Sequence, residues 1–124
     1  MPITHAPATH THEVGSTRFW QLASPSTGSQ EASVWRVEVA TATEPVPHEL
    51  TREEILVVLS GTARASLDGV VEDVGPGGAI VVPADTPFSL TAAGAEPLVA
   101  IAYLPAGGQA RLDDEEPFTP PWAR

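Results

Sequence analysis

The stretch His48–Val74, HELTREEILVVLSGTARASLDGVVEDV, decides the fold. Ile55 to Leu59 is a short apolar run with two consecutive valines that ends at a Ser-Gly pair, which favours a strand over a helix. Ala63 to Leu67 then alternates apolar and polar residues, as a half-buried strand does. The pair Asp68-Gly69 suits a two-residue type I′ turn. The stretch therefore predicts one apolar strand followed by a β-hairpin.

The same signals continue on both sides of this stretch. Ala32 to Val39 has a period of two and one apolar face, which predicts another strand. Downstream, Gly- and Pro-rich turns separate three short segments that we predict as strands, at Ala79 to Val82 (buried), Phe88 to Thr91 and Leu98 to Leu104. Short strands at this spacing, without a long helix, indicate an all-β barrel or double-sheet sandwich.

Composition excludes several functions. A chain of 124 residues has room for one domain. A net charge of -10 argues against nucleic acid and anionic membranes as partners. The sequence has no Cys and no Lys, so disulfides, iron–sulfur clusters, thiolate zinc sites and Schiff-base chemistry are excluded. All six basic residues are arginines, and Arg36, Arg52 and Arg64 are expected to be solvated or paired at the surface. One that faced inward would bind a carboxylate or phosphate.

The two ends differ from the centre. Residues 1–16 are polar and hold three of the four histidines, so we predict an N-terminal arm before a barrel at 17–112. The tail 113–124 carries Phe118 and Trp122, which are too apolar for water, so we expect it to pack on the barrel. No targeting segment and no apolar run near the roughly 18 residues of a membrane span is visible, which predicts a cytoplasmic protein. The preference for Ala, Gly, Pro and Arg indicates a high-GC bacterium.

Two segments resemble the paired motifs of the cupin superfamily. His48, Glu54 and Gly61 fall at the spacing of the first motif. In the second, five residues separate Gly77 from Pro83, and Phe88 takes the place of the histidine. The resemblance covers residues 40–105 and implies a small cupin-like double-stranded β-helix, or jelly-roll barrel. It also implies a homodimer that pairs through its sheets.

The family's metal site is incomplete in this sequence. The resemblance places its four ligand positions at His48, Leu50, Glu54 and Phe88, of which only the first and third can bind a metal. Since a first-row divalent metal normally needs three or more side-chain ligands, we expect no metal cofactor. The alternative is a divalent transition metal on His48 and Glu54, completed by an unexpected group. The spare histidines are His5, His10 and His12, of which His10 and His12 are spaced to share one face of a strand.

The leading functional hypothesis is a metal-independent cupin that binds a small molecule in a largely apolar barrel cavity. His48 and Glu54 would supply the polar contacts or, as tentative catalytic residues, an acid–base pair. The predicted cavity wall consists of Leu50, Leu56, Val58, Phe88, Leu90 and Tyr103.

Two enzymatic hypotheses stay open beside this one. The first is an isomerase, dehydratase or cyclase of bacterial carbohydrate or secondary metabolism that uses His48 and Glu54 as acid and base. The second is a metal-dependent, dioxygenase-like cupin with an altered ligand set. The sequence does not identify a ligand or substrate.

Overall fold

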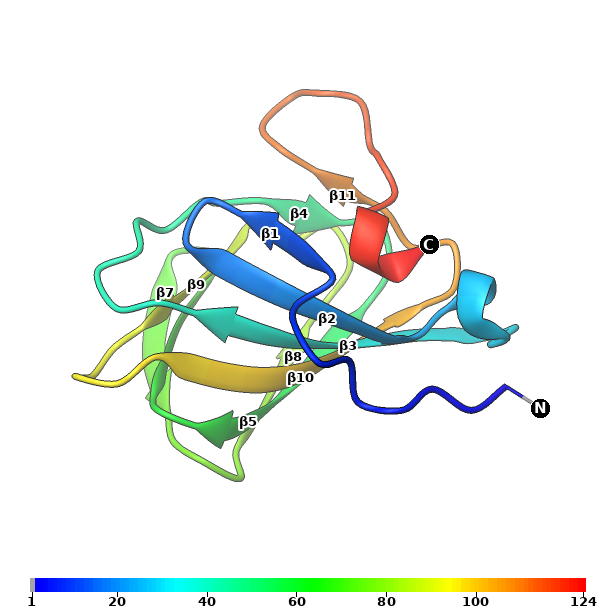
Figure 1. Ribbon diagram of the computed structural model, residues 1–124. Coiled ribbons are helices and arrows are strands. Elements are labelled where there is room, and N and C mark those ends of the chain that lie inside the picture. The colour runs from blue at the N-terminus through cyan, green and yellow to red at the C-terminus, as the bar shows by residue number, and fades with distance from the viewer. Residues whose placement is uncertain (1) are drawn as a thin grey trace.

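The structure, a computed structural model, describes residues 2–124, and over them the chain is almost entirely β (Figure 1). The sheets are antiparallel: a six-stranded sheet in the order β1-β2-β3-β10-β5-β8, a three-stranded sheet β7-β6-β9, and a two-stranded sheet β11-β4. The strands are β1 (His12–Val14), β2 (Thr17–Ala23), β3 (Ala32–Val39), β4 (Glu49–Leu50), β5 (Glu54–Ser60), β6 (Ala63–Leu67), β7 (Val70–Val74), β8 (Ala79–Val82), β9 (Phe88–Ala92), β10 (Leu98–Pro105) and β11 (Ala110–Arg111), and the 3₁₀ helices are η1 (Pro25–Thr27) and η2 (Pro121–Ala123).

The hydrophobic core lies between the six-stranded sheet and the two smaller sheets. Alternation along each strand sends every second side chain inward. On β3, Trp35 and Val37 are buried, and on β10 the inward residues Leu98 and Leu104 are completely buried. The smaller sheets add Leu50, Ala65 and other apolar side chains from the opposite layer. This packing makes the interior of the molecule apolar, with few polar exceptions.

The predicted hairpin is confirmed. β6 and β7 pair with Leu67 opposite Val70. The two turn residues, Asp68 and Gly69, both have positive φ angles, 49° and 84°. A type I′ turn requires this conformation at both positions. The predicted strands at Ile55–Leu59 and Leu98–Leu104 are confirmed as β5 and β10.

The structure adds the strands β1, β2, β4 and β11, which were not predicted, and β8 is less buried than expected. β2 was not predicted, because Phe19 and Trp20 are adjacent and break the period-two pattern. β8 was predicted as fully buried, but Val81 is 51% exposed and Val82 is buried. β8 lies at the edge of the six-stranded sheet and has a second layer on one face only, so its alternate side chains reach solvent.

Both ends of the chain lie against β2. β1 pairs with β2, with His12 opposite Phe19. At the C-terminus, η2 contacts β2 and β3, and Ser33 donates a hydrogen bond to the carbonyl oxygen of Ala123 at 2.6 Å. The side chain of Phe118 is 40% exposed, although its backbone pairs with that of Ala110. No helix within residues 2–124 has the length and apolar character to cross a membrane.

Candidate functional site

His48 lies where the N-terminal end of β4 meets β9. Pro45 and Pro47 keep the preceding segment extended. The backbones of His48 and Phe88 then exchange two hydrogen bonds, of 2.9 and 2.8 Å, in an isolated bridge. The imidazole stands edge-on to the Phe88 ring, with centroids 5.4 Å apart. Its Nδ1–H donates to the carbonyl oxygen of Val46 at 2.9 Å, which leaves Nε2 as the acceptor of the neutral ring.

Glu54 is the buried carboxyl group of the barrel. It begins β5 opposite Val82, and its side chain points inward on the same face as Leu56 and Val58. Only 5% of the residue is exposed, and no hydrogen bond or ion pair to its carboxyl group occurs within residues 2–124. Among these residues Arg36 Nε is the fully buried side-chain polar atom without a partner, so the carboxyl oxygens of Glu54 keep a small contact with solvent. Burial without a partner penalises the charged form and raises the pKa of Glu54 to about 8. The side chain is therefore a neutral acid over most of the neutral pH range.

The structure brings most of the predicted cavity wall together. Leu50, Leu56, Val58 and Phe88 are all buried in one core, and Leu90 packs against it. Tyr103 does not join them. It lies on β10 between the buried residues Ala102 and Leu104, so its side chain projects from the opposite face of the sheet. The predicted pocket is therefore not bounded by Tyr103.

Two pockets of the described chain lie away from the predicted cavity wall. One, of about 290 Å³, is formed by the N-terminal segment and the turn after β2. The other, of about 450 Å³, lies between Glu49, Arg111 and the acidic segment 113–117. Neither is lined by His48, Glu54 or Phe88. No hydrogen bond or ion pair joins His48 to Glu54 in residues 2–124.

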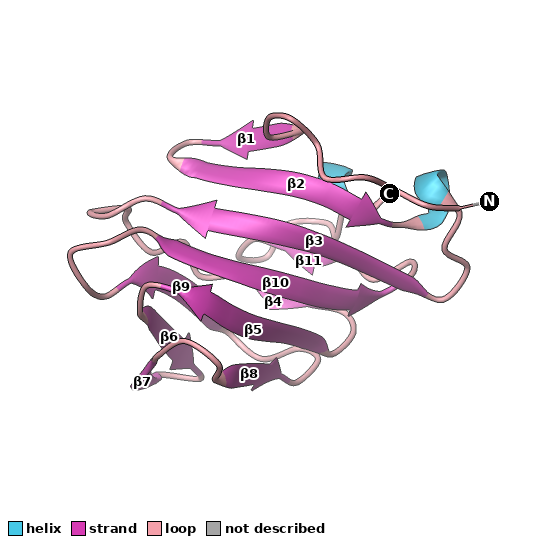
Figure 2. Cartoon of the chain, turned by 60° about the horizontal axis from the view of Figure 1, so that its bottom comes forward, coloured by secondary structure: helices cyan, strands magenta, loops and turns pink. Residues whose placement is uncertain are grey.

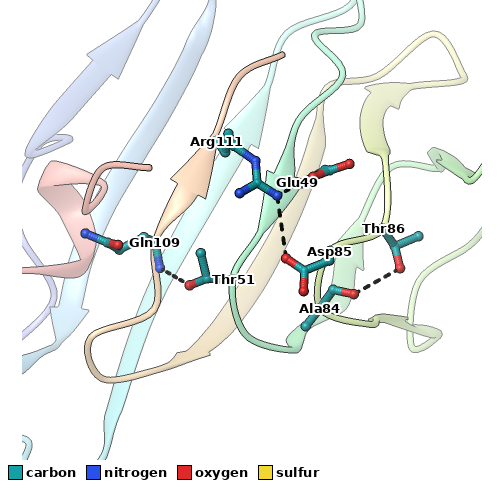
Figure 3. A network of polar contacts seen from close by, with 7 residues as sticks. All are labelled: Glu49, Thr51, Ala84, Asp85, Thr86, Gln109 and Arg111. Carbon is teal, nitrogen blue, oxygen red and sulfur yellow. Dashed lines mark hydrogen bonds and ion pairs between the residues drawn. The ribbon is translucent and has the colours of Figure 1, made fainter. Parts of the chain in front are cut away.

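A polar network that the sequence did not reveal fixes the surroundings of His48 (Figure 3). Arg111 on β11 donates from Nη2 to Glu49 Oε2 at 2.6 Å, and the same nitrogen lies 3.6 Å from Asp85 Oδ1. The carboxylate of Glu49 holds the pKa of Arg111 above its usual range. The backbone N–H of Asp85 also donates to the carbonyl oxygen of Leu50 at 2.8 Å. These contacts tie β4, β11 and the turn before β9 together beside His48.

The residues present do not fit the metal site of the family. Leu50 and Phe88, at two of its four ligand positions, carry hydrocarbon side chains that are almost completely buried. Among residues 2–124, no group of three or more His, Cys, Asp or Glu side chains is placed to hold a metal ion. His10 and His12 contact Trp20 and Trp122 instead of approaching Glu54.

The two packed layers and the inward acidic residue define a small jelly-roll barrel. Residues 33–103 match the family of cupin domains. The chain therefore belongs to the cupin family. No curated protein matches it.

Several solved structures share this fold. The polyketide cyclase RemF from Streptomyces resistomycificus is 23% identical with a TM-score of 0.72, over 82% of this chain and 73% of that one. An RmlC-like cupin from Shewanella frigidimarina is 14% identical with a TM-score of 0.72, over 85% and 90%. A salicylate 1,2-dioxygenase from Pseudoaminobacter salicylatoxidans is 16% identical with a TM-score of 0.70, and this chain covers 34% of its length. At these identities the likeness shows the fold alone.

Proposed function

We propose that this cupin binds a small, largely apolar organic molecule inside the barrel, without a resident metal. The observation that carries the proposal is the carboxyl group of Glu54, which lies nearly buried beside apolar side chains, keeps a small contact with solvent and has no protein partner in the described chain. Buried polar groups in proteins are nearly always hydrogen-bonded, and each exception needs an explanation. A carbonyl or hydroxyl oxygen of a ligand would provide the missing partner.

The surroundings of Glu54 set the class of ligand. Leu56, Val58 and Val82 offer only hydrocarbon contacts, so a charged or strongly hydrated molecule would lose its hydration without compensation. The predicted cavity wall is itself almost completely buried at Leu50, Leu56 and Phe88, so the ligand must be small. We expect entry to need movement of side chains at the end of the barrel where His48 meets Phe88.

Two aromatic probes test this proposal. Acetophenone carries one carbonyl oxygen on a ring, and toluene is of similar shape without the oxygen. We expect wild-type protein to bind acetophenone about tenfold more tightly than toluene in calorimetric titrations, the value of one buried hydrogen bond. The variant Glu54→Met should lose this preference, and the matched variant Glu53→Met, at an exposed neighbouring position, should keep it. A barrel closed to both probes would contradict the proposal.

A second candidate function is acid–base catalysis on such a molecule. It is favoured by the hydrogen bond from His48 Nδ1 to Val46, which orients the ring and leaves Nε2 free to accept a proton. RemF, which has a similar structure, is a polyketide cyclase, and this supports a catalytic role by analogy of fold alone.

Proton abstraction can be measured without knowing the natural substrate. In D₂O, a base at the site would exchange the methyl protons of acetophenone for deuterium, which proton NMR detects. We expect His48→Gln to abolish any exchange above the buffer rate. Binding without exchange in wild-type protein would support the first proposal and reject the second.

A further inference from the structure

One arginine lies on the outer face of the six-stranded sheet without an acceptor. Arg36 on β3 is in register with Trp20 on β2 and Ile101 on β10, and its guanidinium carbon lies 4.7 Å from the centroid of the Trp20 ring. Arg36 takes part in no ion pair within residues 2–124, and its Nε atom is closed to solvent and has no hydrogen-bond partner there. A buried donor left unpaired is costly, because it has lost its hydrogen bonds to water. An acceptor brought from outside the chain would remove this cost.

The strands beside Arg36 place no carboxylate opposite it. The acid on the same face of β3 is Glu38, two residues further along the strand. Glu38 is in register with Arg18 on β2, whereas Arg36 stands between an indole and an aliphatic side chain. Arg18 in turn lies 3.5 Å from Glu13. The face therefore has an acid opposite Arg18 and none opposite Arg36, so the group that it lacks is one negative charge.

The surface around Arg36 is apolar and uncovered. In Figure 2 no part of the described chain lies over β10 or β5 on the viewer's side. Val57, in register with Ile101, is 39% exposed, and Leu59 on the same strand is 50% exposed. Tyr103 shares this face of β10 with Ile101. Trp, Tyr and Arg are the residue types enriched where protein interfaces bind most strongly, and an exposed apolar patch usually marks an interaction surface.

We infer that this face binds a different protein, which presents one Asp or Glu side chain surrounded by apolar residues. The partner's carboxylate would accept two parallel hydrogen bonds from the guanidinium of Arg36, through Nε and one Nη atom. The residue as a whole is only partly buried, so a partner can approach it from solvent, and a rotation of the guanidinium off Trp20 turns Nε toward the acceptor. The partner's apolar side chains would cover Ile101 and Val57.

Shape and charge favour such a protein over other occupants. Small-molecule sites are concave, and neither pocket described above is lined by Arg36, Trp20 or Ile101. The net charge of -10 repels an identical chain at long range and attracts a protein of positive net charge. Packing against Trp20 has already removed part of the hydration of Arg36, so less is lost when the ion pair forms. The partner is therefore expected to be basic overall, with the carboxylate confined to its contact surface.

Random peptides displayed on phage test this chemistry without knowledge of the natural partner. We expect selection on the wild-type protein, with counter-selection on Arg36→Gln, to enrich peptides that carry one Asp or Glu between apolar residues. In calorimetric titrations an enriched peptide should bind the wild type about tenfold more tightly than Arg36→Gln. Replacing the acid of the peptide by the matching amide should cost the same factor. Both changes together should cost little more than either alone, because they remove the same ion pair.

The matched control is Arg52→Gln, which removes a positive charge at an exposed position outside this face and should leave peptide binding unchanged. If Arg36→Gln is misfolded by circular dichroism, Val57→Asp replaces it, because an acid at this exposed position on the face should also weaken binding about tenfold. Enriched peptides without an acid, or equal affinity for both proteins, would overturn the inference. Acetate that binds as tightly as the peptide would indicate a site for small anions instead. A wild type that dimerises in sedimentation velocity through Arg36 would assign the face to a second copy and also overturn it.

Discussion

The indole ring of Trp122 stacks on the phenyl ring of Phe19, with ring centroids 3.7 Å apart and planes 7° from parallel. Phe19 lies on β2 and is buried, and Trp122 belongs to the last turn of the chain, η2. The carbonyl oxygen of Arg124 accepts hydrogen bonds from Gln21 Nε2 at 2.8 Å and Ser26 Oγ at 2.7 Å. The C-terminal turn thus covers apolar surface that β2 would otherwise expose.

Removal of this contact should destabilise the fold. We expect Trp122→Ala to lower the free energy of unfolding by about 2–3 kcal/mol, through lost burial and lost stacking. The melting temperature should fall by roughly 10 °C. Phe118→Ala, at a side chain that is 40% exposed, should cost less than about 1 kcal/mol. Truncation after Leu112 should cost at least as much as Trp122→Ala, and an unchanged melting temperature would show that the tail contributes nothing.

Local signals explain which parts of the fold could be predicted. The turn at Asp68 and Gly69 depends on two residues that tolerate positive φ angles, so the hairpin could be read from adjacent positions. The inward-facing side of β10 could not be predicted from the sequence. Every residue from Leu98 to Leu104 is apolar, so the sequence predicts a strand but does not show which alternate side chains point inward. Only pairing with β3 and β5 sends Leu104 inward and Tyr103 outward.

Part of the candidate site could likewise be predicted from the sequence, and part could not. The spacing of His48 and Glu54 within one motif could be recognised along the chain. The absence of a protein partner for Glu54 could not be predicted, because its surroundings consist of Val82 and other side chains brought from distant strands. The pairing of Glu49 with Arg111 joins residues on β4 and β11, and no periodicity relates them.

Gly61 is required for the turn between β5 and β6. Its φ angle is 73°, and a Cβ atom there would lie 2.2 Å from the carbonyl oxygen of Pro97, which is backbone and cannot move aside. Gly61→Ala should therefore lower the free energy of unfolding by about 3 kcal/mol or more, from both the left-handed conformation and the clash. Gly69 has a similar φ angle of 84° in open space, so Gly69→Ala should cost only about 1–2 kcal/mol. Equal losses in urea unfolding would rule out the clash.

The buried carboxyl group predicts a specific dependence of stability on pH. The pKa of Glu54 is raised by burial from 4.5 to about 8 in the folded protein. Below pH 4.5 the group is protonated in the folded and the unfolded chain alike. As pH rises from there to 8, the unfolded chain releases the proton and the folded chain keeps it, so stability falls by up to about 1.4 kcal/mol per pH unit.

The variant Glu54→Gln removes this titration and retains a polar group of similar size. We expect the variant and the wild type to differ least near pH 4.5, and the variant to gain in relative stability until about pH 8, where the difference becomes constant. Urea unfolding of both proteins at matched pH values gives this difference, in which other titrating groups cancel. Parallel stability curves over the whole range would mean that Glu54 is hydrated or paired in solution.

The last prediction concerns metal. Purified protein should contain well under one equivalent of iron, manganese, nickel, copper or zinc, because Leu50 and Phe88 supply no ligand atoms at two of the family's four positions. The double variant Leu50→His with Phe88→His should raise the affinity for Ni²⁺ or Zn²⁺ by about two orders of magnitude or more, measured by titration calorimetry. Each single variant should do much less. Leu50→Gln with Phe88→Gln places polar groups at the same buried positions without imidazole, so it separates ligation from added polarity. If the double histidine variant keeps its far-UV circular dichroism spectrum and still binds no metal, the alignment of the two motifs that selects His48, Leu50, Glu54 and Phe88 is wrong.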